Sequence, residues 1–145
     1  MRCKLNIFLL VLLCVDFVLS SQAFTQENGD PSLSSMPKRL AMVQAVMCEG
    51  IKENTHQNQA ITFSLKLGKV ICFTSFDPVP EKTFIYHNWF HRDKLNTRIR
   101  LSLQPPRWST FSRIQLRETD KGPWRVEIAD QQGNLLHVLR FSIVD

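Results

Sequence analysis

The chain has 145 residues, of which 43% are hydrophobic, 10% aromatic and 21% charged, with five glycines, seven prolines and a formal net charge of +5. This composition is typical of a folded globular domain and excludes collagen-like, low-complexity and wholly disordered proteins. The length accommodates one hydrophobic core and excludes an enzyme built from two large lobes with a cleft between them.

The amino terminus has the three parts of a secretory signal peptide. Two basic residues precede an apolar run over residues 5–15, and Ser21 and Ala23 place small residues at the two positions that signal peptidase reads. We therefore expect residues 1–23 to be a cleaved signal peptide and the protein to be periplasmic or secreted. The alternative is a retained membrane anchor, but Asp16 interrupts the stretch, and a full span needs about 20 apolar residues.

A composition change separates the signal from the folded part of the chain. Residues 24–37 are polar, rich in turn formers and without periodicity, which predicts a flexible linker. From residue 38 to residue 145 the pattern changes to short runs of strand-forming residues divided by turn signals. We expect this part to be one folded domain.

Two cysteines remain once the signal is removed, Cys48 and Cys72. An even pair outside the cytoplasm is most often a disulfide, so we predict a bridge between them that joins neighbouring strands. The alternative is a free catalytic thiol, which would need a nearby histidine to lower its pKa. Nothing in the sequence around either cysteine suggests such a site.

The strand pattern is all-β. Aromatic and β-branched runs are separated by proline-rich or glycine-containing turns, and several runs alternate between apolar and polar residues. Leu40–Ile51 is predicted as a strand, although it also fits a short helix, and Gln59–Leu67 is a possible further strand. Together the runs predict a single antiparallel immunoglobulin-like β-sandwich of seven or eight short strands. The other predicted strands are Lys69–Phe76, Thr83–His91, Arg98–Leu103, Ser112–Arg117, Trp124–Ile128 and Leu139–Ile143.

The last two strands predict part of the core. They form a hairpin around Asp130–Asn134, and their apolar residues alternate with polar ones. One face of the hairpin should therefore point inward. Its members are Trp124, Val126, Ile128, Leu139, Phe141 and Ile143.

A series of short motifs runs through the second part of the chain. In chain order they are Gly68–Val70 before Phe73-Thr74, His87–Trp89, Pro106–Trp108 before Ser112, Gly122–Val126, Asp130 with Gly133, and Phe141–Ile143. Together they resemble the bacterial domain of unknown function 2914 family, over about residues 40–145. The resemblance implies a compact β-rich domain of the kind found in exported or membrane-attached bacterial proteins. The family has no established activity, so the resemblance assigns no catalytic or binding residue.

Two sets of residues have side chains that could form a metal or catalytic centre. His87 and His91 have a spacing that binds zinc on a helix, but on a strand it separates the two rings by roughly 13 Å, so we expect packed histidines and no metal or cofactor. Most of five candidate acidic residues lie at turns or on the solvent-exposed faces of strands, and their spacing does not single out a catalytic pair, so we expect no enzyme. A small envelope hydrolase acting on polysaccharide remains the alternative; its carboxylates would come from Asp77, Glu81, Glu118, Glu127 and Asp130.

Basic residues form the last candidate site. Nine basic and three acidic residues lie between Arg92 and Arg125, and Trp108 lies among them either in the core or displayed for stacking on a sugar ring. An outward arginine face would bind an anionic envelope component or acidic protein, and nucleic acid is not expected in this compartment. The sequence thus predicts an exported, non-catalytic binding or interaction module. The alternative is that these arginines are only a solvent-exposed surface without a binding role. The predicted face consists of Arg98, Arg100, Arg113, Arg117 and Arg125.

Overall fold

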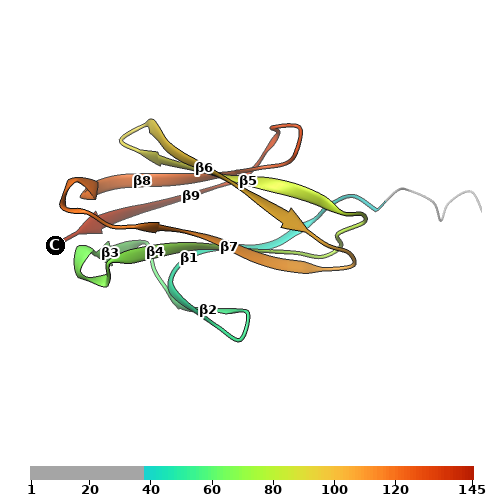
Figure 1. Cartoon of the computed structure of the whole chain (residues 1–145), viewed down its shortest axis with the longest axis horizontal. Coiled ribbons are helices and arrows are strands. Elements are labelled where there is room, and N and C mark those ends of the chain that lie inside the picture. The colour runs from blue at the N-terminus through green and yellow to red at the C-terminus, as the bar shows by residue number, and fades with distance from the viewer. Residues whose placement is uncertain (1–37) are drawn as a thin grey trace, which may run out of the picture. The chain divides into compact units, whose positions relative to one another are not determined.

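The computed structural model describes residues 38–145, so the predicted signal peptide (1–23) and linker (24–37) lie outside the described residues. The described part is a sandwich of two sheets with short connections (Figure 1). Its strands are β1 (Met42–Lys52), β2 (Thr55–Gln59), β3 (Thr62–Ser64), β4 (Lys69–Phe76), β5 (Thr83–His91), β6 (Lys94–Leu103), β7 (Trp108–Gln115), β8 (Gly122–Ala129) and β9 (Leu135–Val144), with 3-10 turns η2 (Leu65–Leu67) and η3 (Glu118–Asp120).

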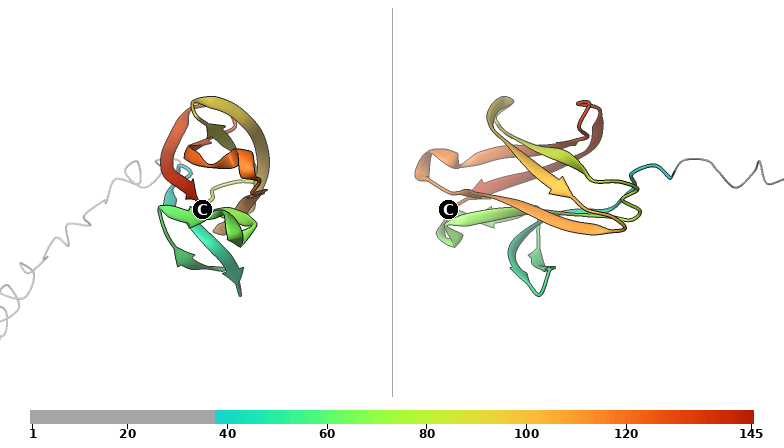
Figure 2. Two further views of the ribbon diagram at one scale, coloured as in Figure 1. Left: turned by 90° about the vertical axis from the view of Figure 1, so that its left-hand side faces the viewer. Right: turned by 45° about the vertical axis from the view of Figure 1, so that its right-hand side comes forward.

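One sheet has four strands in the order β2-β1-β4-β7, and the other has five in the order β3-β9-β8-β5-β6. The views in Figure 2 show the two layers end-on and obliquely. Neighbouring strands are antiparallel except for β3 and β9, which are parallel. The predicted all-β sandwich is therefore confirmed, with one parallel pair added at an edge.

Residues 38–145 form nine strands where the sequence predicted seven or eight. The difference arises around Gln59–Leu67, which was predicted as one strand. β2 ends at Gln59, β3 belongs to the other sheet, and η2 follows it. β2 is polar and almost wholly exposed, so it carries no apolar alternation by which the sequence could reveal it.

The bounds of β4 and β5 agree with the prediction, whereas β6 begins earlier and β7 is shifted toward the amino terminus. In β6 the residues before Arg98 pair with β5 around a two-residue turn, in which His91 faces Lys94. These first residues are polar apart from Leu95, whose side chain is 52% exposed. Backbone pairing extends the strand there without an apolar signal.

The predicted inward face of the β8–β9 hairpin is confirmed. Trp124 pairs with Phe141 and Val126 with Leu139, so these side chains share one face of the sheet. Leu139 is half-buried, and the other five members of that face are buried in the core. Trp108, which the sequence placed either in the core or on display, is 40% exposed.

The predicted disulfide between Cys48 and Cys72 is wrong, because both thiols are free. In the β1–β4 ladder Cys48 pairs with Ile71, and Cys72 pairs with Met47. Successive residues of a strand point to opposite faces, so Cys72 faces the space between the sheets and Cys48 faces the outer side. Neighbouring strands were predicted correctly, but the register places the two sulfurs on opposite sides of one sheet.

The outer side of the four-stranded sheet carries a second buried cluster, formed by Val46, Cys48, Ile71 and Phe73. The β1–β2 hairpin covers it, since Ile51 packs against the cluster and the ring centroid of His56 lies 5.4 Å from that of Phe73. Figure 1 shows this hairpin beneath the sandwich. The domain therefore has a main core between the sheets and a smaller one under the hairpin.

Candidate binding site

The five arginines of the predicted basic face do not share one surface. Arg98 and Arg100 of β6 and Arg125 of β8 lie in the five-stranded sheet, whereas Arg113 lies on β7 of the four-stranded sheet. Arg117 follows β7 at the start of η3. The outer faces of the two sheets lie on opposite sides of the sandwich. Only Arg98, Arg100 and Arg125 therefore share one face.

Aromatic side chains lie beneath these three arginines. The guanidinium carbon of Arg98 is 5.1 Å from the centroid of the Tyr86 ring, and that of Arg100 is 3.8 Å from the Phe84 ring. Arg98 Nε also donates a hydrogen bond of 2.8 Å to Asn88 Oδ1. Cation–π contacts of this kind hold the stems of the arginines against the sheet and leave their charged ends toward water.

Arg125 is the most constrained of the three. Its guanidinium stacks over Phe90 at 4.0 Å, and its Nε donates to Glu127 Oε1 at 2.8 Å. It also pairs with Asp93 at the end of the β5–β6 hairpin. The hydrogen bond with Glu127 raises the pKa of this guanidinium above its ordinary value, so Arg125 is a permanent, oriented cation.

Beside Arg125 the outer face is hollowed, with a volume of about 350 Å³. Arg92, Arg125 and Arg140 line this arginine hollow together with Phe90, Asp93 and the exposed side chain of Ile61. Arg140 stands directly opposite Arg125 in the β8–β9 register. Sequence analysis did not select Arg92 or Arg140, although the predicted β8–β9 hairpin held the signal for the Arg125–Arg140 pair.

The backbone of the β5–β6 turn is strained where it enters the hollow. Arg92 has a φ of +46° and Asp93 a φ of +64°, in the left-handed region that L side chains rarely adopt. Both residues nevertheless carry charged side chains instead of glycine. Arg92 Nη2 donates to the carbonyl of Lys121 at 3.2 Å, and Asp93 pairs with Arg125. The turn thus places one cation and one anion at the rim.

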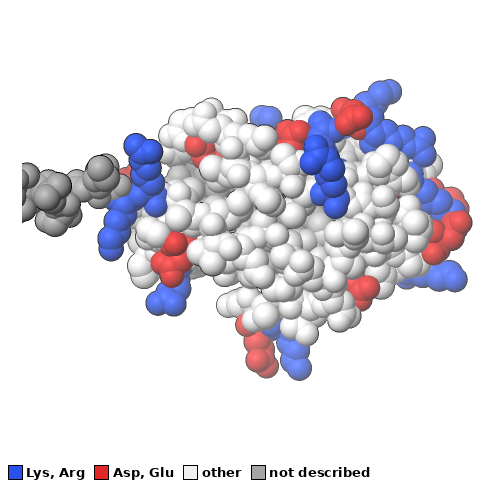
Figure 3. All heavy atoms as spheres, turned by 180° about the vertical axis from the view of Figure 1, so that it is seen from behind, with Lys and Arg blue, Asp and Glu red and all other residues white. Residues whose placement is uncertain are grey.

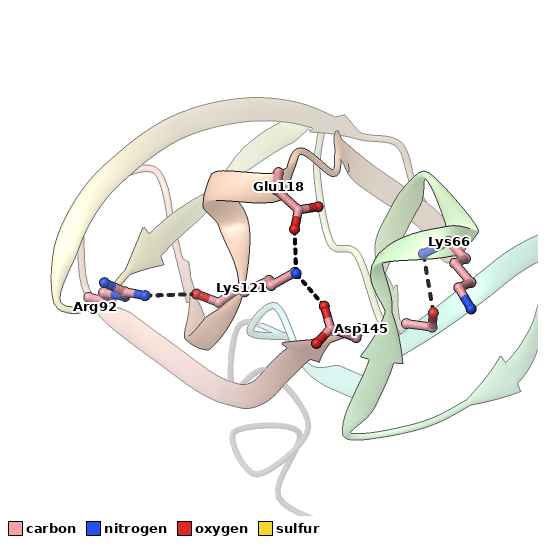
Figure 4. A network of polar contacts seen from close by, with 6 residues as sticks. Lys66, Arg92, Glu118, Lys121 and Asp145 are labelled. Atoms are coloured by element: carbon pink, nitrogen blue, oxygen red, sulfur yellow. Dashed lines mark hydrogen bonds and ion pairs between the residues drawn. The ribbon is translucent and has the colours of Figure 1, made fainter.

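The charge of Lys121, a cation near the hollow, is neutralised by two carboxylates. Lys121 Nζ pairs with Glu118 of η3 and with Asp145 at the end of the chain (Figure 4). Hydrogen bonds from Asp145 and Glu118 raise the pKa of this lysine above its ordinary value. Among the described residues Arg140 forms no ion pair, so it differs from Lys121 in having its charge available for a ligand.

The His87–Ser112 pair has the residue types of a nucleophile and its base, but it is part of the core. His87 is fully buried, and its Nδ1 lies 2.7 Å from Ser112 Oγ, while Nε2 lies 3.3 Å from Thr74 Oγ1. Trp89 Nε1 donates to Ser112 Oγ at 3.0 Å, and Thr74 donates to a carbonyl of β7. Burial lowers the pKa of His87 to about 3, so the imidazole is neutral.

His91, the other predicted packed histidine, stacks on Trp124 with ring centroids 4.5 Å apart. Within residues 38–145 no group of three or more His, Cys, Asp or Glu side chains is arranged to hold a metal ion. In the same range no helix is long and apolar enough to cross a membrane.

Most of the candidate hydrolase carboxylates already have structural partners. Glu118 pairs with Lys121, and Glu127 pairs with Arg125. Asp130 accepts hydrogen bonds from Asn134 and from the backbone of Gln132 in the β8–β9 turn. Partial desolvation opposes these bonds, yet together they lower the pKa of Asp130. Glu118 and Glu127 therefore form surface ion pairs, and Asp130 stabilises a turn.

Comparison with known proteins agrees with the motif resemblance. Residues 82–143 match the model of DUF2914, described as a protein of unknown function. Over this segment the chain is similar to the DUF2914 family, as the motifs predicted. The matched range comprises nearly all of β5–β9, whereas the resemblance from the motifs began at about residue 40. Apart from Ile61 and its neighbour Thr62, the lining of the arginine hollow lies within the DUF2914 segment.

A solved structure shows the same architecture. The crystal structure of an immunoglobulin-like protein from Pseudomonas aeruginosa superposes with a TM-score of 0.53, at 12% sequence identity, covering 76% of this chain and 100% of that one. At this identity the similarity shows the fold alone, and it confirms the predicted immunoglobulin-like sandwich. No curated protein matches the chain significantly.

Proposed function

We propose that this protein is an exported, non-catalytic binding module that holds an anionic partner in the arginine hollow. The observation that carries the proposal is the convergence of Arg92, Arg125 and Arg140 around one depression of the five-stranded sheet. Export is supported by the charged, apolar and small-residue pattern of residues 1–23.

The hollow is organised before any ligand arrives. Glu127, Asp93 and Phe90 orient Arg125, so that guanidinium serves as a fixed wall, and Arg140 stands opposite it in the register. Guanidinium groups match the oxygens of carboxylate and phosphate with paired hydrogen bonds. The lining has three arginines and one aspartate, which leaves an excess of positive charge for an anion.

The rest of the lining limits the ligand further. Phe90 is half-buried under Arg125, and Ile61 is 76% exposed beside the arginines. A partner that places an acidic group next to an apolar one would contact both parts of the hollow. Outer-face Arg98 and Arg100 would add longer-range attraction, which salt screens.

A binding experiment with two anionic probes tests the proposal. Vesicles containing phosphatidylglycerol represent a phosphate surface, and a poly-glutamate peptide represents an acidic protein. We expect binding to at least one probe at about 0.1 M salt and its loss at about 1 M, where the Debye length falls to about 3 Å.

Two variants with the same change of charge make the test specific. Arg140→Glu reverses a charge in the hollow, while Arg113→Glu makes the same reversal on the other sheet. We expect a loss of affinity of about 10-fold or more from the first and little from the second. Equal losses would show attraction to net charge alone, and no binding at low salt would remove the proposed function.

A further inference from the structure

The last strand, β9, is paired along only part of one edge. β8 pairs with it over almost its whole length, whereas β3 pairs only with residues 142–144. On that side residues 135–141 have no neighbouring strand in the described part of the chain, and we call them the free edge. Figure 2 places β9 on one lateral side of the sandwich and β6 on the other, and Figure 3 views the molecule from the β9 side.

Backbone groups of the free edge point away from the sheet. The amide of Ser142 donates to the carbonyl of Ile61 at 2.9 Å, so Ser142 directs its backbone groups away from β8. Alternate residues of a strand direct these groups to the same edge, and the β8–β9 register is uninterrupted here. Val138 and Arg140 therefore turn their N–H and C=O groups to the free edge. Within residues 38–145 neither has a backbone partner on that side.

The rest of the described chain leaves the free edge open. Ala60, just before β3, donates to the carbonyl of Met47 in β1 at 3.2 Å, so the chain turns to the other sheet instead of continuing along β9. A depression of about 360 Å³ lies between the first residues of β1 and His137 of β9. At the start of the edge the side chains of Leu135 and Leu136 are exposed.

The edges formed by β2 and β6 carry protection that this edge lacks. Proteins protect edges with short strands, charges, prolines and bulges. β2 is short and polar, with Asn58 in the left-handed region at φ +54°, and β6 carries Arg98 and Arg100. Residues 135–141 contain no proline, and apart from His137 and Arg140 they are apolar. The free edge is therefore suited to pairing with another strand.

At its other end the free edge reaches the arginine hollow. Arg140 lies on the edge and lines the hollow with Arg125, which stands opposite it in the register. Figure 3 shows a mostly uncharged surface in the middle of this side, with Lys and Arg side chains above it and toward its right-hand end. A strand added here would place every second side chain on the outer face, one beside Arg140 and the next beside half-buried Val138.

We propose that the anionic partner is an acidic peptide segment that adds to β9 as an extra strand. Its main chain exchanges hydrogen bonds with Val138 and Arg140. An acidic side chain pairs with Arg140 at the hollow, and an apolar side chain two residues away packs against Val138. Main-chain bonds supply affinity and alternate side chains supply specificity. This inference rests on the proposed function, and it names the partner as a protein segment.

Two other occupants fit the free edge less well. A lipid headgroup would contact the arginines but would leave the backbone groups of Val138 and Arg140 without partners. A second copy of the chain could pair through its own β9, but β9 contains no acidic residue. Two copies joined in this way would therefore bring no carboxylate to Arg140.

A palindromic peptide tests the proposal in either strand direction. The acetylated and amidated sequence Glu-Thr-Val-Thr-Val-Thr-Glu places a glutamate beside Arg140 and a valine beside Val138 whether it runs parallel or antiparallel. Calorimetry with the full chain should show saturable binding at about 0.1 M salt. We expect Arg140→Glu to lower the affinity at least 10-fold and Arg113→Glu, on the other sheet, to change it little.

Methylation of the peptide backbone separates strand addition from attraction between side chains. One peptide carries methyl groups on its two valine amides, and its matched control carries them on the first two threonine amides. Alternate amides point to opposite edges of a strand, so only one of these peptides has its β9-facing amides blocked. We expect that peptide to lose affinity at least 10-fold and the other to keep it. Equal affinities of the two would overturn strand addition.

A variant of the free edge gives a second readout. Val138→Pro removes an N–H that β8 does not use, and proline is tolerated where the N–H of an edge strand faces solvent. We expect it to lower peptide affinity at least 10-fold while binding to phosphatidylglycerol vesicles is unchanged. Val138→Thr keeps the N–H and should retain peptide binding. If Val138→Pro does not fold, the methylated peptides still decide the question.

The outcomes distinguish this inference from the proposed function. Binding of vesicles without binding of the peptide would overturn the acidic strand and leave the anion site standing. Dimerisation of the chain alone in sedimentation velocity, abolished by Val138→Pro, would assign the edge to a second copy and also overturn the inference. Failure of the peptide, poly-glutamate and vesicles alike would remove the proposed function as well.

Discussion

The Nδ1 atom of His87 lies 2.7 Å from the hydroxyl oxygen of Ser112, which joins β5 of the five-stranded sheet to β7 of the four-stranded sheet. The hydrogen-bond network assigns the proton of the neutral ring to Nε2. Ser112 then donates to Nδ1 and accepts from Trp89, while Nε2–H donates to Thr74, which donates onward to the carbonyl of Thr110. Every donor in this chain has one acceptor.

This network predicts a loss of stability in acid. The unfolded chain protonates His87 below about pH 6.5, whereas the folded chain resists protonation down to a pKa of about 3. The contribution of His87 to stability is therefore complete above about pH 6.5 and is lost as the pH falls toward 3. Urea unfolding should show a fall of about 1.4 kcal/mol per pH unit through this window.

His87→Gln should remove this component of the pH dependence, whatever its effect on stability at neutral pH. His137→Gln, at an exposed position of β9, is the matched control and should keep the full slope. Identical slopes in wild type and His87→Gln would contradict the assignment.

Truncation of Trp124 should strongly destabilise the core. Its ring stacks on His91 at 4.5 Å and its Nε1 donates to the Asp120 carbonyl at 2.6 Å. Trp124→Ala should lower the free energy of unfolding by about 3–5 kcal/mol through lost burial and a cavity. Trp108→Ala, at an exposed position, should cost less than about 1 kcal/mol. Comparable losses in chemical denaturation would mean that the register of β8 is misassigned.

The free thiols predict behaviour opposite to that of a bridged protein. Without reductant, alkylation in denaturant followed by mass spectrometry should modify both Cys48 and Cys72. The native protein should resist alkylation, because burial raises the pKa of both thiols. Melting should be unchanged by reductant. Recovery of a linked Cys48–Cys72 peptide would refute the sheet register.

Replacing Arg92 by glycine should increase stability and weaken anion binding. Arg92→Gly relieves the left-handed conformation at φ +46° and should raise the free energy of unfolding by about 0.5–1 kcal/mol, while it weakens anion binding. Arg113→Gly makes the same substitution within a regular strand, where glycine is unfavourable, and should lower stability. Thermal unfolding of both variants measures the contrast. A destabilised Arg92→Gly would show that its contact with Lys121 outweighs the strain.

The apolar pattern predicted those parts of the candidate sites that depend on one strand or one hairpin. The inward set around Trp124 and Phe141 follows from alternation, because burial of one face leaves a single register for the hairpin. The same alternation predicted that the side chains of Arg98 and Arg100 point outward. It could not relate strands distant in the sequence, so Arg113 was grouped with them although its strand belongs to the other sheet.

The sequence by itself determined the all-β class, the bounds of β4 and β5, the core of the β8–β9 hairpin and the DUF2914 resemblance. These features depend on local periodicity, turn residues and short motifs. Only the tertiary structure decided that Cys48 and Cys72 face opposite sides of a sheet, that Arg92 and Arg140 share a hollow with Arg125, and that the β1–β2 hairpin covers a second buried cluster. The physical reason is that sheet order and inter-strand register depend on packing between residues far apart in the chain, which no local pattern encodes.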